Sequence, residues 1–207
     1  MAIRVGITGG IGSGKSVVGR VLQILGFPVY YSDYEAKQLM TEHKKLRQEL
    51  ISLFGEEAYR GSELNRSFLA DQIFNHPELK EKMNALIHPK VRERFFEWVT
   101  EQNTPIVFNE AAILFETGSY KQFDYTVLVT AKKEIRLQRV KNRDGLTLEQ
   151  VEARMKHQWS DEKKIPLADF VINNNPEDSL FLQLVELLST IVKRENLDEA
   201  LVPKIND

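Results

Sequence analysis

The chain has 207 residues, 42% of them apolar, and a formal net charge of −2. This length allows one sizeable core with small satellite lobes, and the charge provides no general field for nucleic acid or an anionic membrane. The absence of cysteine excludes disulfides, thiolate chemistry and cysteine-ligated metals. With no signal-peptide pattern and no apolar run long enough to cross a bilayer, we expect a cytoplasmic protein, a monomer or small homo-oligomer, that binds neither nucleic acid nor membrane.

Short apolar runs alternate with segments of helical periodicity along the chain. The expected strands are Ile3–Thr8, Phe27–Tyr31, Pro105–Phe108, Tyr125–Val129 and Phe170–Ile172. The expected helices are Lys15–Leu25, most of 34–54 and of 66–102, Lys132–Asn142, Leu148–Trp159 and Glu177–Arg194. A glycine-containing break is expected around 55–61, and Pro77 and Pro89 mark helix starts or breaks. The capping box Thr147-x-x-Gln150 opens the helix expected from Leu148. Strands that alternate with helices predict an α/β fold around a parallel five-stranded sheet flanked by helices.

A complete phosphate-binding motif follows the first expected strand. The segment from Gly9 to Ser16 reads GGIGSGKS, which fits G-x-x-x-x-G-K-[ST] and opens the first expected helix. Its glycines let backbone N–H groups turn inward around phosphate oxygens, and the helix N-terminus adds partial positive charge. We expect Lys15 to reach the β- and γ-phosphates of ATP and Ser16 to ligate Mg²⁺. The expected nucleotide-binding residues here are Gly10, Gly12, Ser13, Gly14, Lys15, Ser16 and Val17.

The motif defines a P-loop NTPase-type sheet, and features outside it narrow the class. The chain contains no guanine-reading N-K-x-D, which a GTPase would need. A nucleic-acid motor would need a longer chain and a basic track. Small size and extra helices therefore favour an ATP-dependent kinase of small molecules.

Asp33 directly follows the second expected strand. The carboxyl ends of parallel strands face the ligand crevice in open α/β sheets, so this carboxylate could accept a proton from an attacking hydroxyl or orient it. Asp33 also precedes an expected helix and could serve as its N-cap. The position alone leaves both readings open.

Three arginines lie at helical spacing in a locally basic segment. Residues 131–164 hold ten Lys and Arg against six Asp and Glu. Arg136, Arg139 and Arg143 share one helix face and suit phosphate oxygens. Beside a P-loop, they favour a lid that closes over ATP and excludes water. The alternative is a solvated surface face.

An ordered set of segments across residues 3 to 190 resembles the dephospho-CoA kinase family. The segments are GITGGIGSGKS, Asp33, Ile87-His88-Pro89, Leu114-Phe115-Glu116, Arg139-x-x-x-Arg143-Asp144-Gly145, Gln158 and Ala168-Asp169-x-Val171-Ile172-x-Asn174. The resemblance implies ATP-dependent phosphorylation of the 3′-hydroxyl of dephospho-CoA, the last step of coenzyme A synthesis, with Mg²⁺. It also implies a core of about 1–33, 103–135 and 165–195, a helical acceptor-binding insertion of about 60–102 and a lid of about 136–160.

The resemblance also carries residue roles. It implies that Asp33 is the catalytic acid, that Arg139 and Arg143 are lid arginines, and that Asn174 lies near adenine. It places His88 in the acceptor-binding insertion, although a buried histidine capping a helix kink before Pro89 is an equal alternative. Whether Glu110 assists the metal or is a helix N-terminal acid also stays open.

Two other functions remain compatible with the motifs. One is a P-loop kinase for a nucleoside, nucleotide or shikimate-like acceptor. The other is a non-catalytic ATP-binding module, which would need no acid at the position of Asp33.

Overall fold

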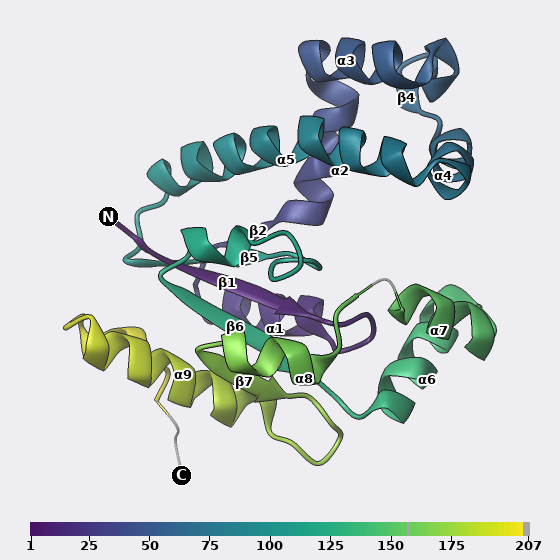
Figure 1. Cartoon of the computed structure of the whole chain (residues 1–207). Coiled ribbons are helices and arrows are strands. Elements are labelled where there is room, and N and C mark those ends of the chain that lie inside the picture. The colour runs from purple at the N-terminus through teal and green to yellow at the C-terminus, as the bar shows by residue number, and fades with distance from the viewer. Residues whose placement is uncertain (157, 205–207) are drawn as a thin grey trace. The chain divides into compact units, whose positions relative to one another are not determined.

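The computed structural model describes residues 1–156 and 158–204, and it divides into two compact units. The sheet unit comprises Met1–Tyr30 and the chain from Gln102 onward, and the helical unit comprises Tyr31–Glu101. Figure 1 shows that the helical unit is a single stretch of chain inserted between strands of the sheet unit.

The sheet unit is built on five strands in the spatial order β2-β5-β1-β6-β7. The strands are β1 (Ile3–Gly9), β2 (Val29–Tyr31, whose last residue begins the helical unit), β5 (Ile106–Glu110), β6 (Tyr125–Thr130) and β7 (Phe170–Asn173). β1 pairs in parallel with β5 and β6, and β6 pairs in parallel with β7. The predicted α/β fold and its five strands are confirmed, and parallel pairing brings the loops after β1 and β5 to the same edge.

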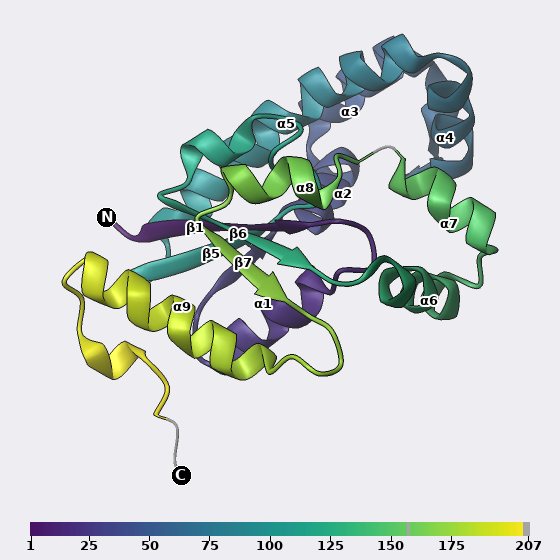
Figure 2. The ribbon, with the colours of Figure 1, turned by 60° about the horizontal axis from the view of Figure 1, so that its bottom comes forward.

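Helices cover the sheet because its strands are apolar on both faces. The described helices of the sheet unit are α1 (Lys15–Ile24), α6 (Lys133–Asp144), α7 (Leu148–Met155), α8 (Asp161–Lys164) and α9 (Leu180–Arg194), with short 3₁₀ turns at Ser119–Gln122, Ile165–Leu167 and Glu199–Leu201. Figure 2 shows α1 and α9 on one face and α8 on the other. Val5, Ile7 and Phe108 are fully buried between these layers. At Gly6 a Cβ would lie 2.7 Å from Leu114, so the segment after β5 packs directly on β1.

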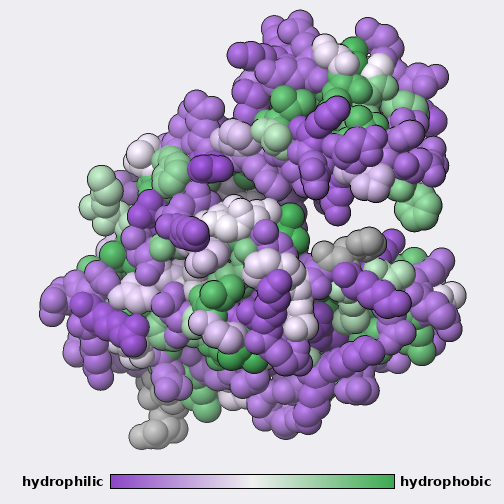
Figure 3. Space-filling view, in the orientation of Figure 1, coloured by the Kyte–Doolittle hydropathy of each residue, from purple (hydrophilic) through white to green (hydrophobic). Residues whose placement is uncertain are grey.

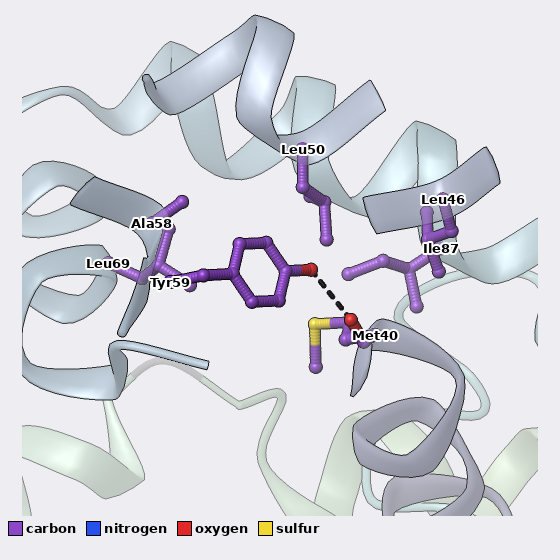
Figure 4. Packing of buried hydrophobic residues seen from close by; sticks show 7 residues of the cluster. All are labelled: Met40, Leu46, Leu50, Ala58, Tyr59, Leu69 and Ile87. Carbon is purple, nitrogen blue, oxygen red and sulfur yellow. Dashed lines mark hydrogen bonds between the residues drawn. The ribbon is translucent and has the colours of Figure 1, made fainter. Parts of the chain in front are cut away.

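The helical unit has a separate core. It contains α2 (Ser32–Glu42), α3 (Lys44–Phe54), α4 (Arg66–Asn75), α5 (Pro77–Thr100), a 3₁₀ turn (Glu56–Ala58) and a two-stranded hairpin of β3 (Tyr59–Arg60) and β4 (Glu63–Leu64). Its buried cluster consists of Met40, Leu46, Leu50, Ala58, Tyr59, Leu69 and Ile87 (Figure 4). The Tyr59 hydroxyl donates to the Met40 carbonyl at 2.6 Å, which satisfies the one polar atom of a ring that packs in the apolar cluster, with the Arg47 guanidinium 4.1 Å from its centroid.

Several expected boundaries are wrong. Pro89 neither starts nor breaks a helix, because α5 runs through it, whereas Pro77 does occupy the first turn of α5. The helix expected to reach Trp159 ends at Met155, and α8 and the hairpin were not expected. The capping box of Thr147 and Gln150 at the start of α7 is confirmed. The helical unit spans Tyr31–Glu101, and the acceptor-binding insertion of about 60–102 stays a prediction.

The surface is predominantly hydrophilic on the face shown in Figure 3, where hydrophobic side chains form scattered groups. Single exposed apolar residues such as Ile24 and Phe74 are ordinary for a folded protein. In the described parts of the chain, no helix combines the length and apolar character needed to cross a membrane.

Candidate functional site

The P-loop turns from β1 into α1 through backbone conformations that favour glycine. Gly12 has φ +79° and Gly14 has φ +97°, both in the left-handed region where a Cβ is strained. Within the turn the Ser13 N–H donates to the Gly10 carbonyl at 3.1 Å. Gly14 is the N-cap of α1 and offers no side-chain cap, and the first turn of α1 has no acidic residue. The positive end of this helix is therefore left for an external anion.

The reactive side chains of the P-loop lie at the start of α1. Lys15 Nζ donates to the Gly9 carbonyl at 3.0 Å, so the ammonium is held against the loop that it would serve. Ser16 and Val17 are exposed in the first turn. The structure thus brings the predicted residues from Gly10 to Val17 into one short turn.

Arg139 and Asn174 meet behind the P-loop, at the Ser13 carbonyl. Asn174 Nδ2 donates to this oxygen at 2.8 Å, and Arg139 Nη1 lies 3.4 Å from it. Arg139 Nη2 also donates to the Asn174 carbonyl at 2.9 Å. A Cβ on Gly14 would lie 2.0 Å from Asn174 Nδ2, so this glycine is required for the close approach. Two residues predicted from distant parts of the sequence therefore share one backbone acceptor.

Arg136, on the same helix face, links the P-loop to an acidic residue of α8. Its Nε donates to the Ile11 carbonyl at 3.0 Å, and its Nη1 pairs with Asp161 Oδ2 at 3.0 Å. A Cβ on Gly10 would lie 2.0 Å from Arg136 Nη2. The reading of the stripe as a solvated face is therefore wrong for Arg136 and Arg139.

Arg143 lies at the outer end of α6. Its guanidinium makes two hydrogen bonds to the neighbouring Asp144, at 2.7 and 3.0 Å, and Arg154 approaches the same carboxylate at 3.2 Å. The hydrogen bond with Arg143 lowers the pKa of Asp144 and raises the pKa of Arg143. The structure does not bring Arg143 to the P-loop contacts that hold Arg139.

The segment that returns from α7 to the sheet is anchored by side chains whose role the sequence analysis missed. Gln158 Oε1 accepts the Ile11 N–H at 2.7 Å, and its Nε2 donates to the Ala112 carbonyl at 3.3 Å. Glu116 Oε1 accepts the Trp159 N–H at 3.1 Å and lies 2.8 Å from the fully buried ammonium of Lys164. Gln158 and Glu116 had been noted only as parts of family motifs, and sequence offers no signal for pairings across more than 40 residues.

In the helical unit, Asp33 lies in the first turn of α2, whose N-cap is Tyr31. The alternative role of Asp33 as the N-cap is therefore wrong. A negative charge in the first turn still stabilises the helix through its dipole. His88 lies within α5, where burial lowers its pKa, Arg92 lowers the pKa further, and Asp33 offsets part of the decrease. These three residues thus form one electrostatic group. Arg92 was missed, although its i+4 spacing from His88 could have identified it.

Known proteins match the chain over nearly its whole length. Residues 3–179 match the family description dephospho-CoA kinase. A dephospho-CoA kinase of Bacteroides fragilis (strain YCH46) is 41% identical over 94% of this chain and 95% of its own length. One of Porphyromonas gingivalis is 40% identical over 94% of this chain and 97% of its own length.

Solved structures agree with these matches. TT1252 from Thermus thermophilus superposes with a TM-score of 0.81 at 36% identity, covering 95% of this chain and 99% of that one. A dephospho-CoA kinase from Campylobacter jejuni gives a TM-score of 0.69 at 27% identity, covering 94% and 100%. Fold and P-loop together define a protein of the P-loop NTPase class. Within that class, the chain belongs to the dephospho-CoA kinase family.

Proposed function

We propose that this protein transfers the γ-phosphoryl group of ATP to the 3′-hydroxyl of dephospho-CoA, giving coenzyme A and ADP. The observation that carries the proposal is the formed P-loop at the open N-terminus of α1, in a chain of the dephospho-CoA kinase family. Backbone groups from Gly10 to Val17 cradle the phosphates, and Lys15 stabilises the charge that develops during transfer.

Magnesium fits this site as a partner of the nucleotide. The described residues contain no group of three or more His, Cys, Asp or Glu that could hold a metal ion. Mg²⁺ commonly keeps several waters and binds through few protein ligands plus substrate phosphates. Ser16, exposed at the start of α1, is the proposed protein ligand. When bound with the nucleotide, the ion would neutralise negative charge on the phosphate chain.

We propose that residues of about 136–160 form a lid that closes over ATP. Arg139 supplies positive charge beside the P-loop, since its guanidinium already contacts the Ser13 carbonyl. Asn174 lies at the same carbonyl, which supports its proposed place near adenine. Arg143 would first have to exchange its two bonds to Asp144 for phosphate oxygens.

The acceptor proposal rests on the helical unit. Asp33 follows β2, at the carboxyl end of a strand in the parallel sheet. As general base it takes the proton of the 3′-hydroxyl while that oxygen attacks the γ-phosphorus and ADP leaves. His88 is proposed to contact the acceptor, with the insertion of about 60–102 forming its binding surface. Cytoplasmic location and the monomeric or small homo-oligomeric state remain predictions.

The test is phosphoryl transfer by the purified protein with ATP and Mg²⁺ on a panel of dephospho-CoA, shikimate, a nucleoside and a nucleotide. We expect turnover of dephospho-CoA alone. The Lys15→Ala variant should keep the fold and lose at least about 10²-fold in kcat, because it removes a cation aimed at developing charge. Preference for another acceptor would contradict the assigned substrate, and normal kcat in Lys15→Ala would contradict the role of Lys15.

A further inference from the structure

The peptide between Gly10 and Ile11 is held on both of its polar sides. Its carbonyl, on Gly10, accepts the Ser13 N–H at 3.1 Å. Its N–H, on Ile11, donates to Gln158 Oε1 at 2.7 Å. One bond comes from the P-loop itself, whereas the other comes from a residue 147 positions away. The orientation of this peptide therefore depends on a side chain outside the motif.

The orientation matters for an anion site. A peptide that turns over exchanges a positive N–H for a negative carbonyl, and the Gly10 side of this peptide has no Cβ to resist the rotation. Such a turn would break the bond to Ser13 and aim a carbonyl dipole at different surroundings. With its N–H bonded to Gln158 and its carbonyl bonded to Ser13, this peptide is fixed in one orientation, and a fixed backbone is what a preorganised phosphate cradle requires.

Gln158 is itself held in place. Its Nε2 donates to the Ala112 carbonyl, in the segment that follows β5. The next residue, Trp159, donates its N–H to Glu116, and that carboxylate pairs with the buried Lys164. The glutamine therefore ties the loops after β1 and β5 to the segment that returns from the lid helices.

We propose that Gln158 is a positioning residue, which sets the Gly10–Ile11 peptide in the orientation that binds the polyphosphate of the donor nucleotide. The proposal rests on the proposed function only in taking ATP as that donor. Gln158 contacts backbone and is assigned no contact with substrate. Its loss should weaken binding of the phosphate chain while leaving the acceptor and the fold almost unaffected.

The test compares Gln158→Met, which keeps the side-chain length and removes both hydrogen bonds, with Gln183→Met. Gln183 is a matched control because it also bridges backbone groups, accepting the Asn173 N–H and donating to the Asn173 carbonyl, each at 2.8 Å. Net hydrogen bonds of about 0.5–1.5 kcal/mol correspond to a loss of roughly 2- to 12-fold in affinity for one bond. We expect a loss of this order for ADP and ATP in Gln158→Met, measured by calorimetry, and none for adenosine.

Two further readouts separate positioning from general destabilisation. Amide exchange at Ile11 should accelerate in Gln158→Met and not in Gln183→Met, because only the first variant removes the acceptor of that N–H. The KM for ATP should rise while the KM for dephospho-CoA stays within about twofold. Gln158→Ala serves as a second variant if the methionine variant fails to fold.

Several outcomes would overturn the proposal. Unchanged ADP affinity in Gln158→Met would do so, as would equal losses for ADP and adenosine accompanied by a lower thermal midpoint than in the control. If the wild-type protein bound ADP but did not phosphorylate dephospho-CoA, the proposed function would fail. The ADP and amide-exchange measurements would then still decide the role of Gln158.

Discussion

The candidate site of the sheet unit consists mainly of backbone groups, whereas that of the helical unit consists of side chains. In the sheet unit, Gly12, Gly14 and the start of α1 supply backbone groups, and Arg136, Arg139, Asn174 and Gln158 bind the carbonyls and N–H groups of the loop. In the helical unit, Asp33, His88 and Arg92 are side chains on two packed helices, grouped by charge. Backbone groups recognise a phosphate, which many ligands share. Side chains on a helix face can differ from one protein to another and can therefore select one acceptor. We therefore expect generic donor binding in one unit and substrate choice in the other.

The largest expected effect tests whether the helical unit takes part in chemistry. Asp33→Asn removes the proposed base, and a positioned base contributes about 10²–10⁴-fold, so we expect a fall in kcat of that order with ATP affinity unchanged. The control is Glu35→Gln, because Glu35 is the other acid in the first turn of α2. Both variants lose a charge that favours the helix dipole, worth roughly 0.3–1 kcal/mol, so a similar small decrease in stability is expected in each. Near-normal turnover in Asp33→Asn would confine chemistry to the sheet unit.

The next effect tests how the sheet unit holds its loops. Lys164 is fully buried and lies 2.8 Å from Glu116, so Lys164→Met leaves an unpaired carboxylate in the interior. Breaking a buried pair costs about 3–5 kcal/mol, and we expect the thermal midpoint to fall by roughly 10 °C. Lys163→Met, on an exposed neighbour whose ammonium lies 3.6 Å from the Trp159 ring centroid, should lower stability much less, by about 0.5–1 kcal/mol.

The double variant Glu116→Gln with Lys164→Met sharpens this test. In the wild-type protein the Trp159 N–H donates to Glu116. A glutamine at this position can still accept that N–H but carries no charge. Most of the lost stability should therefore return, because the uncompensated buried charge is gone. A double variant as unstable as Lys164→Met would mean that packing, and not charge, is what the lysine contributes.

The sequence predicted correctly those features that depend only on residues close together in the chain. The P-loop and the capping box of α7 were identified correctly because glycine conformation and caps are local properties. The helical spacing of Arg136, Arg139 and Arg143 gave no way to tell their roles apart. Only the tertiary contacts show that Arg136 binds the Ile11 carbonyl, Arg139 contacts the Ser13 carbonyl and Arg143 pairs with Asp144 at the surface. The roles of Gln158, Glu116 and Lys164 could not be predicted, since their pairing depends on how distant segments pack. Pro89 was misread because an exposed proline can be accommodated within a long helix.

A smaller effect tests whether the two units are energetically separate. Tyr59→Phe removes the hydroxyl that donates to Met40 in the core of the helical unit, and we expect a loss of about 1 kcal/mol. Hydrogen exchange should accelerate in residues 31–101 and not in the sheet, with unchanged ADP affinity. Tyr34→Phe, at an exposed ring, is the control. Equal acceleration in both units would contradict their separation.

The smallest effect concerns pH. Because the pKa of His88 is below its ordinary value of 6.5, the folded state binds fewer protons than the unfolded state when the pH falls below that value. Stability should thus be unaffected by His88 above about pH 6.5 and decrease as the pH falls through the lowered pKa. His88→Asn should reduce this decrease in urea titrations between pH 7 and 5. Identical pH profiles for wild type and His88→Asn would contradict the assignment.

The insertion of the helical unit within the sheet unit has a consequence for the order of folding during synthesis. The helical unit is contiguous, so its core can form as soon as its own residues have emerged. β1 leaves the ribosome before the helical unit, yet Ile3 pairs with Ile106 and Val5 with Tyr125. At roughly 5–20 residues per second, this apolar strand waits about 5–20 s for its partners. β1 is thus buried only after the whole helical unit has emerged, and it is where a chaperone that binds apolar segments would act.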